Sequence, residues 1–197
     1  MFYYFPFRGS TVRNLLAFQV LQTVFLKSQS EYLDTIILDA VSTIYSADNA
    51  NYFLSDSLNF LPQSCEKICF KSVKVQEKFF HLVEFLVHQL RHVPCKELIA
   101  ISLLLKAQTN QKCCQLAVKS LISLIKFDAI FKNVLREIGM FEALIGCLSS
   151  SLTTSSTETG LTHIKDEDEG IGSLGEVVTV ALTDLISGNQ ANANVFR

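Results

Sequence analysis

The chain has 197 residues, a formal net charge of −2 and 49% hydrophobic residues. A mean hydropathy of +0.29 excludes an intrinsically disordered chain. Seventeen basic against nineteen acidic side chains give no electrostatic basis for wrapping nucleic acid. Eight Gly and three Pro are too few turn-forming residues for a many-stranded sandwich or barrel. The composition therefore predicts a soluble helical domain.

The sequence predicts neither a signal peptide nor a membrane-spanning helix. The apolar start, residues 1–7, ends at Arg8 and is too short for a signal peptide. The most apolar later run, residues 98–105, is far shorter than the ~18 residues that a membrane helix needs. Six cysteines without a secretory signal predict reduced thiols, no disulfides and a cytoplasmic location.

Most of the sequence has the apolar periodicity of amphipathic helices, with apolar residues at i, i+3, i+4 and i+7. The predicted helices, in chain order, are 11–27, 31–46, 50–57, 72–92, 94–107, 110–126, 128–137, 139–148 and 174–187. Pro94 suits the first turn of its helix, because the missing N–H has no partner there anyway.

Residues 149–173 interrupt this periodicity. They are rich in Ser, Thr and Gly and contain an acidic run at 166–169, a composition that cannot form a packed core. The segment is predicted to be a flexible loop between helices. An inert, solvated loop is favoured over a regulated or partner-binding insertion, although its hydroxyls beside acidic residues keep the second interpretation open.

A weak internal repeat combines a helix end, a turn with an asparagine and an apolar pair. It aligns Asn51, Asn133 and Asn194. Helical units that return in this way predict an α-solenoid, in which each unit packs only on its neighbours. The third copy stops at Arg197, where its next helix would begin, so this copy is predicted to be truncated. Helix 174–187 should then leave an apolar face bare, a hazard for aggregation or dimerisation.

The best metal candidates are two thiols and three imidazoles. These are Cys65, Cys69, His81, His88 and His92. Cys65 and Cys69 form one i, i+4 pair, and His88 and His92 form another. This spacing places the two side chains of each pair on one helical face. The pairs are too far apart for a zinc finger, so thiols in the core and imidazoles at a helix end are the favoured interpretation.

Cys95 is the candidate nucleophile, because it follows a helix-starting proline and precedes Lys96. No Cys–His–Asn or Cys–His–Asp pattern accompanies it, so a packing role is favoured. Cys113 and Cys114 are adjacent on a predicted helix, and Cys114 falls in its apolar stripe. No nucleotide-binding, hydrolase or metalloprotease motif occurs.

Two polar patterns point to binding surfaces. Four lysines would form one basic stripe if their stretch were continuously helical: Lys67, Lys71, Lys74 and Lys78. Such a stripe could meet an acidic partner or an anionic membrane, but a solvated helix face is favoured. The three aligned asparagines could bind an extended peptide, but helix capping is the favoured role.

Four segments resemble one family. They are RNLLAFQVLQTVFLKS (13–28), IILDAVSTIYSADNANYF (36–53), PCKELI (94–99) and FKNVLREIGMFEALI (131–145). They are similar to the Alfy (Blue cheese) group, the WD repeat and FYVE domain-containing proteins of the BEACH class. The similarity runs from about residue 9 to 145, lapses in the Ser-rich loop and returns at NANVFR. It lies in the armadillo-like amino-terminal region of those proteins.

The resemblance implies a cytoplasmic scaffold in selective autophagy of protein aggregates or in membrane traffic. In that family the PH–BEACH unit, the WD repeats and the FYVE domain, which binds phosphatidylinositol 3-phosphate, are carboxy-terminal. This sequence matches none of these modules, so lipid binding would come only through domains that it lacks. The expected partners are other proteins.

These observations combine into one prediction. The fold is all-α, an armadillo-like α-solenoid of eight to nine helices with one long flexible loop. Its parts are an unmatched leader (1–8), helical repeats (9–148), the loop (149–173) and a further, truncated repeat (174–197). The function is a non-enzymatic scaffold with no catalytic, cofactor or metal residues. The alternatives are a stand-alone helical adaptor unrelated to autophagy and, less favoured, a Cys95-dependent enzyme.

Overall fold

The computed structural model describes residues 13–155 and 173–196, in which all regular structure is helical. The leader and most of the predicted loop lie outside these ranges. The α-helices of the described residues are α1 (Leu15–Lys27), α2 (Glu31–Ala47), α3 (Ala50–Ser57), α4 (Phe60–Ile68), α5 (Val73–His88), α6 (Cys95–Ala107), α7 (Gln111–Phe127), α8 (Ile130–Glu137), α9 (Met140–Ser155), α10 (Leu174–Ile186) and α11 (Gln190–Ala193).

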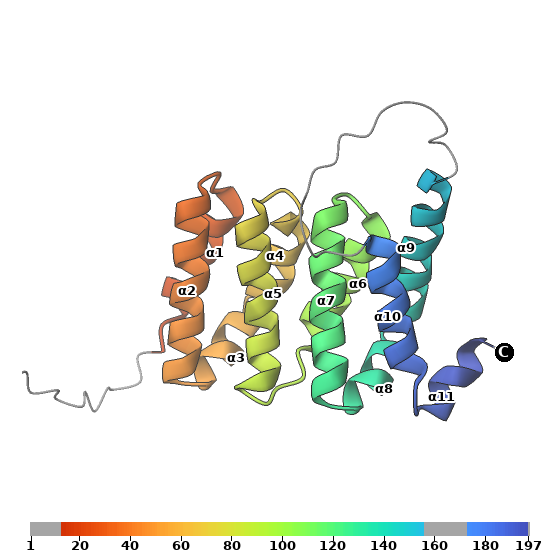
Figure 1. Cartoon of the computed structure of the whole chain (residues 1–197). Helices are drawn as coiled ribbons and strands as arrows, with labels where there is room; N and C mark the ends of the chain where they lie inside the picture. Colours follow the sequence, from red (N-terminus) through yellow and green to blue (C-terminus); the bar gives the residue numbers. More distant parts are fainter. Residues whose placement is uncertain (1–12, 156–172, 197) are drawn as a thin grey trace, which may run out of the picture.

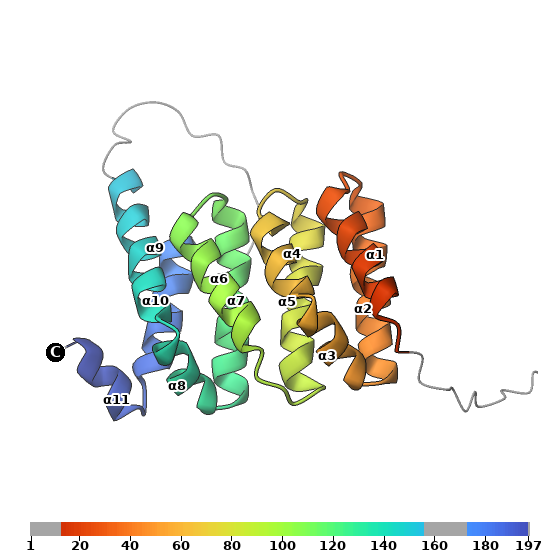
Figure 2. The same cartoon turned by 180° about the vertical axis from the view of Figure 1, so that it is seen from behind.

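The long helices form two layers that lie back to back (Figures 1 and 2). In layer A, α2 packs on α5, α5 on α7, and α7 on α10. In layer B, α1 packs on α4, α4 on α6, and α6 on α9. The short helices α3 and α8 turn the chain from layer A back to layer B at the lower edge of Figure 1. Each chain segment therefore packs mainly on the segments next to it.

An internal repeat relates the two halves of the stack. Helices α6, α7, α8 and α9 begin 80 residues after α1, α2, α3 and α4, and the first three pairs also end 80 residues apart. The capping residues repeat as well. The carboxylates of Asp48 and Asp128 accept hydrogen bonds from the Ala50 and Ile130 amides at 3.0 and 2.9 Å. The asparagine alignment predicted from the sequence differs from this register.

The predicted helices are confirmed to within a few residues, with three corrections. Helix α4 was absent from the prediction, because Pro62 and the polar residues around it obscure the apolar period; proline is tolerated in this first turn. Helix α5 ends at His88, and Arg91 takes a left-handed conformation (φ 56°) in the link to α6. Helix α9 continues to Ser155, so residues 149–155 are helical and not part of a loop.

One apolar core runs through the whole stack between the two layers, and it contains a buried ion pair. The Lys71 ammonium lies 3.0 Å from the Asp34 carboxylate, and both side chains are at least nine-tenths buried. Lys71 also donates to the carbonyls of Phe25 and Ser28 at 2.8 and 2.6 Å. These bonds offset much of the cost of removing the two charges from water, and they join α1, α2 and the α4–α5 turn.

A second buried polar group lies where α3 meets α6. Glu97, in the first turn of α6, is 1% exposed, and the Tyr52 hydroxyl donates to its carboxylate at 3.3 Å. Burial raises the pKa of the Glu97 carboxyl, because the site disfavours the charged form. Beside it, the hydroxyls of Tyr45 and Ser55 are hydrogen-bonded to each other.

The end of the stack at α10 is less apolar than predicted. Leu174, Val178, Ala181 and Leu185 are buried, and α10 packs on α7 and α9. Val180 is the large apolar side chain that α10 exposes. Across the described ranges, no helix combines the length and the apolar character needed to cross a bilayer.

Candidate docking groove between α4 and α6

An apolar groove of about 470 Å³ lies on layer B between α4 and α6. Its α4 side contains Pro62, Cys65, Glu66 and Cys69, and Phe70 follows the helix. Its α6 side contains Lys96, Ile99, Ala100, Leu103, Leu104 and Ala107, and Thr109 follows the helix. The groove exists because α4 is only nine residues long and α6 presents small alanines toward it.

The groove has an unusually apolar rim. Phe70, Ile99 and Leu103 are 72%, 47% and 60% exposed. Ile99 and Leu103 are spaced i, i+4, so they form one ridge along the outer side of α6. Exposed apolar side chains that cluster around a hollow are typical of a protein-binding surface.

The charges at the rim are unequally partnered. The Lys96 ammonium pairs with Asp56 of α3 at 2.8 Å. Glu66 is exposed, and within residues 13–155 and 173–196 it has no ion-pair partner. A partner in this groove would therefore meet one free negative charge beside the apolar ridge.

Apart from Cys95, the cysteines are packing residues rather than activated thiols. Cys65 and Cys69 lie in the groove wall, and burial raises the pKa of both thiols. Burial also raises the pKa of Cys113 to about 12 and of Cys114 to about 11. Cys114 lies in the core as predicted. A raised pKa keeps a thiol protonated at neutral pH, which lowers its nucleophilicity.

Cys95 lies at the first position of α6 after Pro94, as predicted. Its side chain is exposed, so the packing role favoured for it from the sequence is wrong. This placement is compatible with chemical modification of the thiol. It does not by itself provide the oriented base that a cysteine nucleophile requires.

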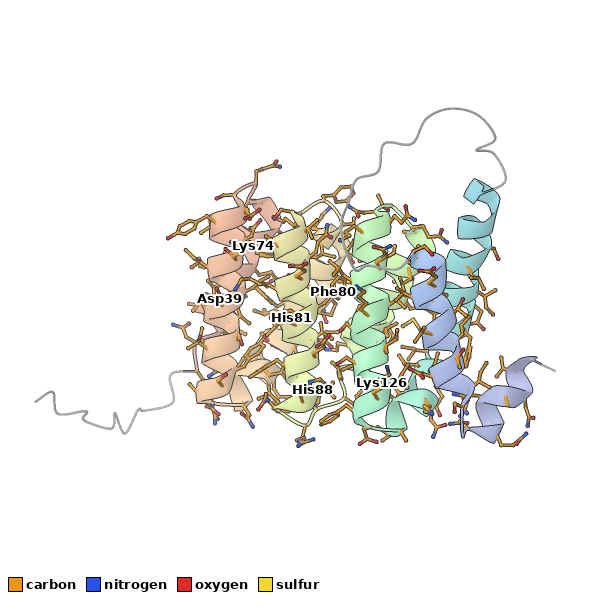
Figure 3. All side chains as sticks on the ribbon, viewed as in Figure 1. Asp39, Lys74, Phe80, His81, His88 and Lys126 are labelled. Atoms are coloured by element: carbon orange, nitrogen blue, oxygen red, sulfur yellow. The ribbon has the colours of Figure 1, made fainter. Side chains whose placement is uncertain are left out.

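The histidines of the metal candidate are dispersed. His81 is exposed on the outer side of α5 (Figure 3). The His88 ring packs on Phe127 and the His92 ring on Tyr52, with ring centroids 4.5 and 4.7 Å apart. In the described part of the chain, no three His, Cys, Asp or Glu side chains converge as metal ligands would. The structure thus separates residues that the sequence placed together only by spacing.

The lysine stripe is not continuous, because α4 ends at Ile68 and α5 begins at Val73. Lys71 is buried against Asp34, whereas Lys74 and Lys78 pair with Glu31 and Asp39 of α2. Most of the predicted basic surface is therefore neutralised within the molecule. Of the four lysines, only Lys67 has no ion-pair partner in the described ranges, and it is the charge that remains for an acidic partner or an anionic membrane.

The capping role expected for the aligned asparagines is wrong for Asn51 and Asn133, whereas Asn194 is the C-cap residue of α11. Asn51 is buried inside α3, Asn133 is exposed inside α8, and Asn194 begins the short 3₁₀ helix after α11. The asparagines whose side chains cap helix N-termini are Asn14, Asn110 and Asn189, each of which accepts a hydrogen bond from a backbone amide. Turn composition alone did not distinguish a cap from its neighbours.

The outer side of layer A contrasts with the groove. Surface ion pairs join its neighbouring helices: Lys78 with Asp39 between α5 and α2, and Lys126 with Asp184 between α7 and α10. Figure 3 labels one member of each pair, Asp39 and Lys126. Sequence reasoning missed the groove, because it depends on α4 and on the contact of α4 with α6. The signal in the sequence that could have indicated it is the i, i+4 pair of apolar residues Ile99 and Leu103.

Comparisons with known proteins identify relatives of nearly the whole chain. No family model matches, and no solved structure matches. The chain is 30% identical to WD repeat- and FYVE domain-containing protein 4 of Mus musculus over 190 residues, and to the protein of the same name from Homo sapiens over 193 residues. Each match covers 96% of this chain and 6% of the relative.

A plant protein extends the set. The Protein SPIRRIG of Arabidopsis thaliana is 29% identical over 133 residues, 68% of this chain and 4% of the relative. BEACH domain-containing protein A2 from the same organism is 27% identical over 133 residues, with the same coverage. The chain spans about 6% of the length of the mouse and human relatives and about 4% of the length of the two plant relatives. Across this segment, the chain belongs to the family of WD repeat- and FYVE domain-containing and BEACH domain proteins.

Proposed function

We propose that this chain is a non-enzymatic scaffold segment of a BEACH-type protein, and that it binds other proteins through the groove between α4 and α6. The two-layer stack would then be an armadillo-like α-solenoid, whose units present a fixed surface. The observation that carries the proposal is the exposed apolar ridge of Ile99 and Leu103 beside a hollow, on a chain homologous to scaffold-type proteins.

The occupant that fits this groove is an amphipathic helix of a partner protein. Its apolar side chains would contact Phe70 and the α6 ridge. Its flank would carry Lys or Arg opposite Glu66, the free charge of the rim. The cellular role that we propose, from the family resemblance, is cytoplasmic scaffolding in selective autophagy of protein aggregates or in membrane traffic.

Quantitative affinity isolation with matched variants tests this function. Leu103→Asp places a charge on the apolar ridge, and Glu66→Lys reverses the charge of the rim. Val180→Asp, on α10, is the control, because Val180 is 46% exposed and α10 packs on α7 and α9, whereas residues of α4 and α6 line the groove. The expected result is one set of bound proteins that both groove variants lose and the control keeps.

The bound segment is then identified by cross-linking from Lys96, which lines the groove. An amphipathic helix with a basic flank is expected among the cross-linked peptides. The proposal is contradicted if the wild type and Leu103→Asp retain the same proteins, or if the cross-linked peptides are acidic or non-helical.

A further inference from the structure

The two ends of the stack expose very different amounts of apolar surface. At the α1–α2 end, five large side chains form what we call the end face: Leu16, Val20, Tyr32, Leu33 and Ile36. Their exposed fractions run from 39% to 76%. At the other end, the exposed large apolar side chains among those described are Ile145 of α9, Val180 of α10 and Val195 after α11, at 40%, 46% and 50%. The bare surface therefore lies at the opposite end from the one that the sequence predicted.

The internal repeat identifies the kind of structure that covers such a face. The residues 80 positions after Val20, Leu33 and Ile36 are Ala100, Cys113 and Leu116. Cys113 is fully buried, and Ala100 and Leu116 are half-buried, on helices that pack against α4 and α5. In the second half, a pair of antiparallel helices thus covers the surface that remains bare in the first half.

The edge of the end face is more apolar than the edge of the equivalent surface on α6 and α7. The positions equivalent to Leu16 and Tyr32 are Lys96 and Lys112, side chains that favour contact with water. In the first half these edge positions carry apolar side chains that are 70% and 76% exposed. The end face is therefore wider than the surface that one adjoining helix pair covers in the second half.

We infer that the end faces of two copies of this chain pack against each other and form a two-fold dimer. In such an interface each surface meets itself, so like charges at its centre would repel. The five side chains are uncharged, and α1 contains no charged residue before Lys27 in its last turn. The copy supplies what the repeat requires, an apolar pair of antiparallel helices.

The exposed area is compatible with a weak dimer. Five large side chains, each about half exposed, provide an apolar patch of roughly 400–500 Å² per copy, within the range of the largest, often functional, patches on monomeric proteins. Two copies would bury about 1,000 Å² of total surface, near the lower limit for a specific interface. A dissociation constant in the micromolar range is therefore expected. This inference does not depend on the groove of layer B.

Sedimentation equilibrium of the 197-residue chain from about 1 to about 100 μM tests the dimer. The wild type is expected to change from monomer to dimer within this range. Val20→Glu and, separately, Ile36→Glu should weaken association at least about tenfold, because each places a charge on the end face. Leu16→Gln, which adds no charge, should weaken it less.

Val180→Glu is the matched control at the other end of the stack, and circular dichroism verifies that each variant is folded. A wild type that stays monomeric to about 100 μM would overturn the inference, whatever else covers the face. So would a dimer that survives Val20→Glu and Ile36→Glu, or one that Val180→Glu dissociates.

Discussion

The two outer sides of the stack are built from the same kind of helix pairs but present different chemistry. On layer A, ion pairs join neighbouring helices, as between Lys78 and Asp39. On layer B, α1 and α4 are joined by apolar packing and by the Gln22–Gln63 hydrogen bond, and α4 and α6 border the apolar groove. Charged side chains that pair with each other keep one side hydrated, whereas the groove side leaves apolar area and one free carboxylate for a partner.

The chemistry of the buried packing positions likewise differs between the two halves of the repeat, although the backbone repeats. Asp34, Tyr45 and Ser55 of the first half correspond, 80 residues later, to Cys114, Ile125 and Leu135. The same packing positions are therefore polar in one half and apolar in the other. Substitutions at particular contacts can separate stabilisation by polar and charged pairs from stabilisation by apolar packing.

The largest expected effect comes from the buried ion pair of Asp34 and Lys71. Lys71→Met removes the ammonium and leaves the Asp34 carboxylate buried without its counter-charge, which should cost about 3–5 kcal/mol in the free energy of unfolding. Urea denaturation measures this loss. The double variant Asp34→Leu, Lys71→Met should recover part of it, because no uncompensated charge remains. A double variant less stable than Lys71→Met alone would contradict this interpretation.

A smaller effect is expected from the pH dependence at Glu97. Because its pKa is raised in the folded state, the carboxyl stabilises the fold at low pH, where it is protonated in both states, and that contribution is lost as the pH rises through the folded-state pKa. Glu97→Gln is neutral at every pH and can still accept from Tyr52. The variant should gain stability relative to the wild type as the pH rises from about 4.5 upward.

Thermal unfolding of both proteins across this pH range provides the measurement. Tyr52→Phe is the matched comparison, because it removes a hydrogen bond that lowers the pKa of Glu97 but keeps the titrating carboxyl group, so its stability should still fall as the pH rises. A constant difference in stability between the wild type and Glu97→Gln at all pH values would show that Glu97 titrates alike in the folded and unfolded states.

The surface ion pairs of layer A should contribute least. Lys78 is 33% and Asp39 62% exposed, so solvent screens their attraction. Lys78→Gln is expected to cost at most about 1 kcal/mol, and less at high salt. Urea denaturation at low and high salt checks this. A loss as large as that of Lys71→Met would mean that these pairs hold the layer together.

The groove residues should matter for binding and hardly at all for stability. Leu103→Ser changes a side chain that is 60% exposed, so the free energy of unfolding should stay within about 0.5 kcal/mol of the wild type. Leu98→Ala, one turn away on the buried side of α6, should cost about 2–5 kcal/mol. Equal losses for the two variants would place Leu103 in the core.

The sequence was sufficient for helices with a clean apolar period. Helix α3 was predicted with its observed bounds, and α2 and α6 to within one residue at each end. Helix α4 was missed because Pro62, Gln63 and Glu66 interrupt the period around its buried residues. Its burial depends on contacts with α1 and α6, which a local pattern does not contain.

The candidate surfaces were harder to predict, for the same physical reason. The groove and the end face are defined by which helices lie side by side. The lysines from Lys67 to Lys78 looked like one stripe, yet a break in the helix turns Lys71 inward to Asp34. Spacing along the chain predicts faces of single helices, and only the packing shows which faces remain open.

Oxidative footprinting of complexes isolated from cells tests most directly whether layer B, rather than layer A, receives the partners. Hydroxyl radicals oxidise exposed aromatic, aliphatic and imidazole side chains, so Phe70 and Leu103 report on the groove and His81 on layer A. The account predicts that bound proteins protect Phe70 and Leu103 and leave the oxidation of His81 unchanged. Protection of His81 with Phe70 and Leu103 still oxidised would contradict it.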